Sequence, residues 1–134
     1  MEKKKGKDYG SKPTIIFVYN ADSGLLNALK DYVHKIVSPK TYACNLCAVT
    51  FGNLGMKKDW KNFIANLDFP IEFLHRDEFF ERYHLENIKF PSAYIKRGSD
   101  ISLFITQEEM NSLQSLDDLM KLVTKKVNEI RADK

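Results

Sequence analysis

The 134-residue chain has few cysteines, prolines and glycines, and beyond its first residues it has no excess of either charge. Of its 21 basic and 18 acidic residues, five lysines, Glu2 and Asp8 lie within residues 1–13, which leaves 16 of each sign from Thr14 onward. Phosphate binding needs clustered Lys and Arg, and the balanced charge gives no sign of such a surface. We therefore expect no nucleic-acid partner, and a disordered basic tail over residues 1–13.

The sequence also lacks a long apolar run. The longest near its start covers residues 15–19, whereas a membrane span needs roughly twenty residues and the core of a secretory signal roughly seven to fifteen. These lengths predict a cytoplasmic protein with no membrane partner. In that reducing compartment we expect the two cysteines to be thiols, and any disulfide between them to be transient rather than structural.

Phosphate-binding motifs are missing as well. The chain contains neither GxxxxGK[ST] nor GxGxxG. It therefore lacks the glycine-rich loop and the lysine that bind phosphates in nucleotide-hydrolysing enzymes, and we do not expect that function. The sequence Asp22-Ser23-Gly24 follows an apolar run and precedes a helical pattern. Backbone amides at such a turn can hold an anion, but ordinary capping of the helix explains Asp22 and Ser23 equally well.

What is present is an alternation of strand and helix patterns over residues 14–134, the length of one domain. The expected strands are residues 14–20, 71–74, 92–96 and 101–106, and the expected helices are residues 25–37, 60–67, 79–85 and 116–130. Residues 41–51 favour a strand or loop, and Ser115 with Asp118 predicts a capping box for the last helix. This order predicts an α/β fold: a mixed sheet of four or five strands, helices on both faces, and a C-terminal hairpin followed by a helix.

Cys44 and Cys47 are the strongest chemical signal in the chain. A turn or a first helical turn brings two cysteines at this spacing to one side, whereas a strand would put them on opposite faces. Three interpretations remain open: a dithiol that exchanges with disulfides, half of a metal site, and two small buried apolar residues. The first two require Cα atoms no more than roughly 7 Å apart for the pair to bridge.

Histidines could complete a zinc site with the two thiolates. His75 follows a predicted strand and is the better candidate, while His34 stands shortly before the cysteines near the end of a predicted helix. The alternative for His34 is an exposed imidazole whose positive charge interacts favourably with the dipole at the C-terminus of its helix. The alternative for His75 is a place in a solvated segment, in which Asp77 caps the next helix. The third histidine, His84, is expected at the surface. Zinc is thus the one cofactor that the sequence suggests, and no other follows from it.

The chain resembles the thioredoxin-like fold superfamily. The resemblance rests on the strand IIFVYN, the motif CNLC, the segment KFPSAYIKRG, the strand ISLFIT and the terminal helix, and on the interval from Cys47 to Pro91. It implies a cis Phe90-Pro91 bond, with Pro91 shaping the backbone that faces the cysteines. It also implies a thiol-disulfide oxidoreductase with a protein disulfide as substrate, in which Cys44 attacks and Cys47 resolves the mixed disulfide.

One feature departs from that family. Its first cysteine lies on the first turn of the helix that follows a central strand, where the helix N-terminus lowers the thiol pKa. Here the strand FVYN ends in Asp22-Ser23-Gly24 without a cysteine, and residues 48–58 separate the pair from the next predicted helix. The segments FVYNADSGLLNAL and CNLCAVTFG also resemble a group of small uncharacterised bacterial proteins with a CxxC motif, which implies no mechanism. The remaining alternative is a thioredoxin-like interaction domain with inert cysteines.

Overall fold

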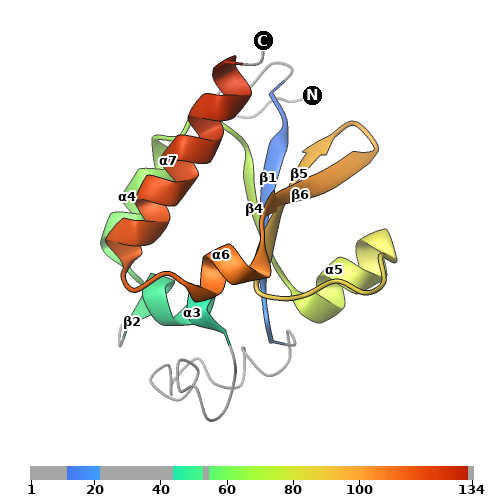
Figure 1. Ribbon diagram of the computed structural model, residues 1–134, viewed down its shortest axis with the longest axis horizontal. Helices are drawn as coiled ribbons and strands as arrows, with labels where there is room; N and C mark the ends of the chain where they lie inside the picture. The colour runs from blue at the N-terminus through green and yellow to red at the C-terminus, as the bar shows by residue number, and fades with distance from the viewer. Residues whose placement is uncertain (1–11, 22–43, 53–54, 133–134) are drawn as a thin grey trace.

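The computed structural model describes residues 12–21, 44–52 and 55–132 of the chain (Figure 1). In chain order the elements are β1 (Thr14–Tyr19), α3 (Asn45–Thr50), β2 (Phe51–Gly52), β3 (Gly55–Met56), α4 (Lys58–Ala65), β4 (Ile71–His75), α5 (Arg76–Tyr83), β5 (Ser92–Arg97), β6 (Asp100–Ile105), α6 (Gln107–Asn111) and α7 (Leu116–Ala132). Two expectations lie outside these residues. One is the tail over residues 1–11, and the other is the helix over residues 25–37, which would contain His34 and be capped by Asp22-Ser23-Gly24. Lys12 belongs to the predicted tail but bonds to Asp68, 2.5 Å from its carboxylate.

Four strands form a mixed sheet in the order β4-β1-β5-β6. β1 pairs parallel with β4 and antiparallel with β5, and β5 and β6 form a hairpin whose turn contains Gly98 at a φ of 61°. Glycine adopts this left-handed conformation without strain. The predicted mixed sheet and its closing hairpin are therefore confirmed, and β1 is an interior strand. β2 and β3 form a separate two-stranded ribbon.

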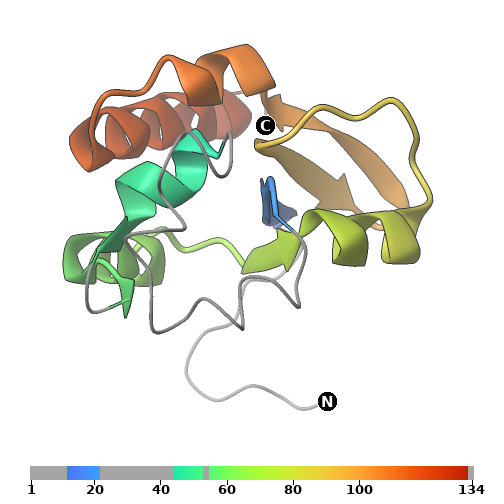
Figure 2. The same cartoon turned by 90° about the horizontal axis from the view of Figure 1, so that it is seen from below.

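The sheet buries side chains on both faces, as the unbroken apolar run of β1 predicts. Ile15, Phe17 and Tyr19 belong to the larger core cluster, which also holds buried residues of α3, α4 and α7. Ile16 and Val18 point to the opposite face, where the smaller cluster includes Phe79 of α5. Figure 2 shows α3, α4 and α7 on one side of β1 and α5 on the other. Helices cover both faces, as expected.

Most of the predicted helices are found, with shifted ends. α4 and α7 cover the expected segments, and Ser115 Oγ accepts a hydrogen bond from Asp118 N at the start of α7. α5 begins at Arg76, three residues before the predicted start. α6 was not expected, although Thr106 and Glu109 cap it reciprocally. In the described ranges, no helix has both the length and the apolar character needed to cross a membrane.

Residues 45–50 correct the expectation of a strand or loop around the cysteines, because they form the helix α3. Its sequence, NLCAVT, is rich in β-favouring residues, but four of its six residues are buried. The sulfur of Cys44 accepts a hydrogen bond from Cys47 N, the role that a Ser or Asp oxygen has at most helix starts. The buried Thr50 hydroxyl donates to Leu46 O at 2.7 Å within the same helix. Packing and capping therefore outweigh the weak helix propensity.

Candidate functional site

Cys44 and Cys47 form a disulfide at the start of α3, with their Cα atoms 5.3 Å apart. Cys44 is the N-cap residue and Cys47 lies in the first turn, so both sulfurs are on one side of the helix. This confirms the predicted separation and excludes the strand arrangement that would have kept them apart. The two sulfurs are within disulfide-bonding distance of each other, and the chain has no other cysteine.

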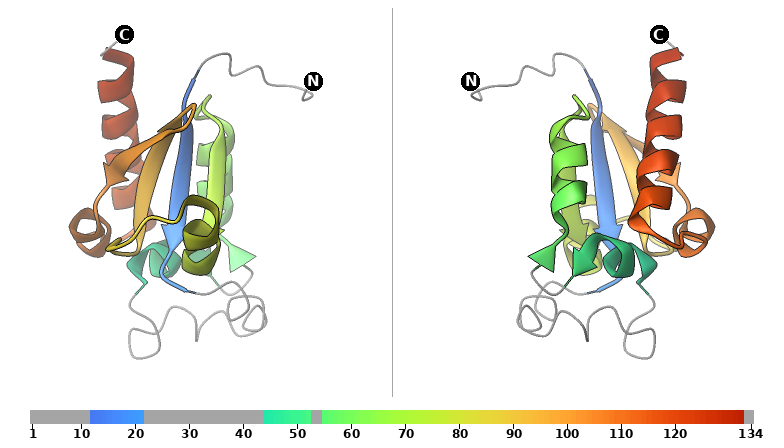
Figure 3. Two further views of the ribbon diagram at one scale, coloured as in Figure 1. Left: turned by 90° about the vertical axis from the view of Figure 1, so that its right-hand side faces the viewer. Right: turned by 90° about the vertical axis from the view of Figure 1, so that its left-hand side faces the viewer.

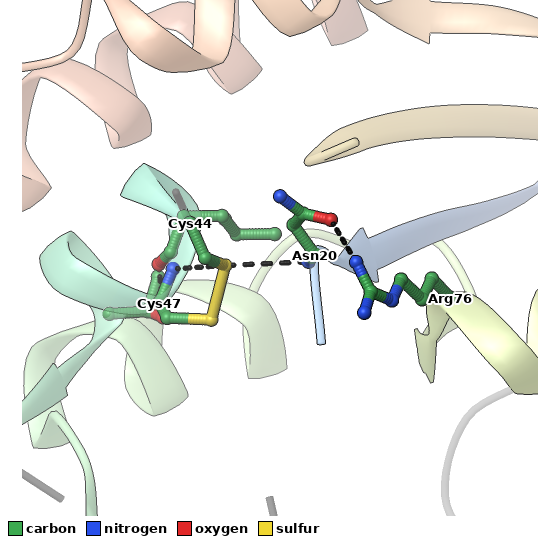
Figure 4. The surroundings of a disulfide bond; sticks show 6 residues. Asn20, Cys44, Cys47 and Arg76 are labelled. Carbon is green, nitrogen blue, oxygen red and sulfur yellow. Dashed lines mark hydrogen bonds between the residues drawn. A yellow bond between two sulfur atoms is a disulfide. The ribbon is translucent and has the colours of Figure 1, made fainter. Parts of the chain in front are cut away.

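The sulfur of Cys44 accepts hydrogen bonds from two backbone amides (Figure 4). One donor is Cys47 N at 3.3 Å, and the other is Asn20 N at 3.4 Å, just beyond the end of β1. Both cysteines are buried, with exposed fractions of 4% for Cys44 and 1% for Cys47. Cys44 is therefore distinguished from Cys47 by its two amide donors and not by its exposure.

Asn20 is in turn held by Arg76, the first residue of α5. Arg76 Nη1 donates to Asn20 Oδ1 at 3.0 Å, and Arg76 N donates to Ala21 O at 3.1 Å. In Figure 4, Asn20 lies between the guanidinium and the sulfur of Cys44. Sequence analysis missed both residues, because 56 positions separate Asn20 from Arg76 and no local motif joins them.

Asn45 links the start of α3 to α6 and to the segment between α6 and α7. Its Nδ2 atom donates to Met110 O at 2.7 Å and to Leu113 O at 2.8 Å. The first residue between the two cysteines therefore belongs to the packing of the helix and is only partly exposed. The disulfide is thus attached to β1 through Asn20 and to the C-terminal helices through Asn45.

The strand register brings His75 and Pro91 to the same edge of the sheet as Asn20. Tyr19 pairs with His75, and Pro91 stands one position beyond the pair of Val18 and Ser92. Figure 3 shows α3 beside this edge, where the β1 arrow ends. The Phe90-Pro91 bond is cis, as predicted, and Gln107 Nε2 donates to the Phe90 carbonyl at 2.9 Å.

The imidazole of His75 is engaged with Glu78. His75 Nδ1 lies 2.7 Å from Glu78 Oε1, which also accepts a hydrogen bond from His75 N at 2.7 Å. Desolvation alone would raise the pKa of Glu78, but these contacts with His75 outweigh it and lower the pKa. His75 itself, rather than the expected Asp77, occupies the N-cap position of α5.

The predicted zinc site is not assembled among the residues that the structure describes. In that part of the chain, no three His, Cys, Asp or Glu side chains come together as ligands for a metal ion. His34 lies outside it, so the site made of Cys44, Cys47, His75 and His34 stays a prediction. His84 is exposed at the end of α5, as expected.

Tyr19 is a further residue at this edge that sequence analysis treated only as part of a strand. Its ring stacks on Phe73 and contacts Phe51 and His75, and its side chain is buried. Within the described residues its hydroxyl has no hydrogen-bond partner. Burial raises the pKa of Tyr19 far above its ordinary value of 10.0, so this hydroxyl stays neutral.

Comparison of the chain with protein-family models, with curated proteins and with solved structures gives no match.

Proposed function

We propose that the chain is a thiol-disulfide exchange protein whose reactive centre is Cys44 and Cys47. The observation that carries this proposal is the pair of backbone amides, Asn20 N and Cys47 N, that donate to Cys44 Sγ. When the disulfide is reduced, the same donors face a thiolate, and hydrogen bonds to a charged acceptor are about twice as strong as neutral ones. The geometry therefore favours the thiolate, which is the nucleophilic form.

The exchange follows from this asymmetry between the two sulfurs. The Cys44 thiolate attacks one sulfur of a substrate disulfide, forms a mixed disulfide and releases the other substrate sulfur as a thiolate. Cys47 then loses its proton and attacks Cys44 Sγ, which releases the second substrate sulfur and closes the Cys44–Cys47 bond. Two electrons pass from the protein dithiol to the substrate disulfide. The proton that Cys47 loses and the one that Cys44 had given to solvent on forming its thiolate protonate the two substrate thiolates.

The arrangement of the sheet supports a thioredoxin-like scaffold for this chemistry. β1 is interior and is paired with a parallel and an antiparallel strand, and the CxxC pair lies at its carboxyl end on the first turn of a helix. The Phe90-Pro91 segment stands at the same edge. One feature departs from that family, since 24 positions separate Asn20 from Cys44.

Reduction of insulin driven by dithiothreitol tests the proposal. We expect the wild-type protein to accelerate precipitation of the insulin B chain above the rate with dithiothreitol alone, and Cys44→Ser to abolish the acceleration. Cys47→Ser is the matched control, because it removes the same disulfide but keeps the attacking sulfur. It should accumulate a covalent adduct with the substrate that dithiothreitol releases. If insulin precipitates at the same rate with wild type and with Cys44→Ser, and Cys47→Ser forms no adduct, the proposal is wrong and the disulfide is inert.

A further inference from the structure

The segment that follows β1 carries the amide that approaches Cys44 from outside α3. Residues 20 and 21 lie beyond the last pair of the β1–β4 ladder, so strand pairing no longer fixes their orientation. Arg76 holds both of them, since its backbone N donates to Ala21 O and its guanidinium donates to Asn20 Oδ1. The direction of Asn20 N–H therefore depends on a side chain at the start of α5.

We propose that Arg76 is a positioning residue for the reactive disulfide. Through Asn20, it orients the backbone N–H that donates to Cys44 Sγ and so stabilises the reduced, thiolate form of Cys44. This inference rests on the exchange function proposed above and names a residue that tunes it. Arg76 is not itself in contact with the sulfur in this scheme, because Asn20 lies between them (Figure 4).

Arginine suits this role for two physical reasons. Its guanidinium keeps its positive charge at every pH at which proteins fold, and its planar donors fix the geometry of the acceptor better than a lysine ammonium does. At the start of α5, Asp77 and Glu78 are the acidic residues next to Arg76, and Glu78 is bonded to the His75 imidazole. The positive charge of Arg76 also adds a favourable field for a thiolate, so positioning and charge must be separated by experiment.

Two quantities report on the thiolate without any protein substrate. The first is the ratio of thiolate to thiol at pH 7, measured by absorbance at 240 nm in a Cys47→Ser background, in which Cys44 is the one cysteine left. The second is the equilibrium constant for reduction of the intact disulfide by glutathione. We expect Arg76→Ala and Asn20→Ala each to lower both quantities by about three- to tenfold, because a hydrogen bond to a charged sulfur is weakened. The double variant should lie no lower than either single variant, since both changes remove one coupled interaction.

The matched control is Arg82→Ala on the same helix. Arg82 donates to Glu72 at 2.8 Å on the outside of the molecule, so its loss removes an arginine and its side-chain hydrogen bond from the same helix but should leave both quantities unchanged. If Asn20→Ala keeps wild-type values while Arg76→Ala lowers them, Arg76 acts through charge alone and the positioning role is wrong. The role is also wrong if Arg82→Ala lowers both quantities equally. Asn20→Ala carries the test if Arg76→Ala does not fold.

The insulin assay keeps the two proposals distinguishable. Wild-type acceleration together with unchanged thiolate ratios in Arg76→Ala and Asn20→Ala would reject the positioning role and keep the exchange function. The opposite result is a wild-type protein that does not reduce insulin, together with lowered thiolate ratios in both variants. It would reject the exchange function but keep the structural effect of Arg76 on Cys44.

Discussion

Asn45 and Met110 are joined by a 2.7 Å hydrogen bond from the side-chain amide of Asn45 to the Met110 carbonyl, across 65 positions of sequence. The same amide donates to Leu113 O, so one side chain links the first turn of α3 to α6 and to the segment that follows it. Because Cys44 precedes Asn45 directly, this link also fixes where the disulfide stands relative to α7. Asn45 therefore holds α3 in place, in addition to setting the spacing between the two cysteines.

Replacing Asn45 by Ala should lower the free energy of unfolding by about 1–3 kcal/mol, because two partly buried carbonyls lose a donor. The measurement is urea denaturation of the oxidised protein. Asn66→Ala is the matched control, since Asn66 Nδ2 donates to Asn62 O at an exposed position, and it should change stability by less than about 0.5 kcal/mol. Equal effects of the two variants would contradict the structural role of Asn45.

Replacing Tyr19 by Phe should keep or raise stability at pH 7, by up to about 1 kcal/mol, because it removes a buried hydroxyl that has no partner among the described residues. The ring contacts with Phe73 and Phe51 are retained. Thermal and urea denaturation would measure the change. A clear loss of stability would mean that the hydroxyl makes a stabilising bond in solution.

The same variant should also differ from wild type at alkaline pH. Burial raises the folded-state pKa of Tyr19, so the folded protein holds this proton more tightly than the unfolded chain does. Stability is therefore unaffected below pH 10.0, the ordinary pKa, and is lost as the pH rises above it. Tyr19→Phe has no hydroxyl to titrate, so its free energy of unfolding should exceed that of the wild type by an increasing amount above pH 10. Parallel curves for the two proteins would contradict the raised pKa.

Glu109 gives the opposite dependence at acid pH. Burial would raise the pKa of Glu109, but the hydrogen bond from Thr106 N and the ion pair with Lys126 at 3.0 Å outweigh it and lower the pKa below 4.5. The stabilisation is present above pH 4.5 and is lost as the pH falls through the folded-state pKa. The stability difference between wild type and Glu109→Gln should thus be constant near pH 6 and shrink below pH 4.5. Denaturation curves across this range check it, and Glu108→Gln, on the same helix, is the control.

Metal content of the reduced protein tests the zinc hypothesis. Cysteines bind zinc as thiolates, so the oxidised protein is expected to carry none through this pair. The hypothesis predicts near-stoichiometric zinc in reduced protein purified without a metal-affinity column, lost in Cys47→Ser and weakened in His75→Ala but not in His84→Ala. Elemental analysis measures it. A reduced protein that holds no zinc, and whose melting temperature ignores both a chelator and added zinc, would make the hypothesis wrong.

The sheet could be predicted from the sequence because its signals are local. The apolar run of β1, the hairpin around Gly98 and the stripe along α7 each occupy one short segment. The start of α6 was also within reach, since Thr106 and Glu109 have the spacing of a capping box.

The helical state of α3 could not be predicted in this way. Cysteine, valine and threonine favour strands, and the cap is a sulfur, which no capping rule anticipates. The link from Arg76 through Asn20 to Cys44 depends on the β1–β4 register, which brings residues 56 positions apart into contact. Local patterns carry no such information. The sequence indicates the cysteine pair itself, whereas the residues that hydrogen-bond around it are identified only by the fold.

The interior place of β1 has a consequence for how the chain reaches its native state during synthesis. β1 precedes the other strands in the described part of the chain, but its partners begin only at Ile71 and Ser92. The run TIIFVY therefore emerges from the ribosome long before either partner, and unpaired apolar strands of this kind are prone to associate with copies of themselves. The β5–β6 hairpin closes over a short loop and forms from local contacts, so it offers β1 a template once residue 105 is free. The growing chain is thus most exposed to aggregation before its C-terminal third has been made.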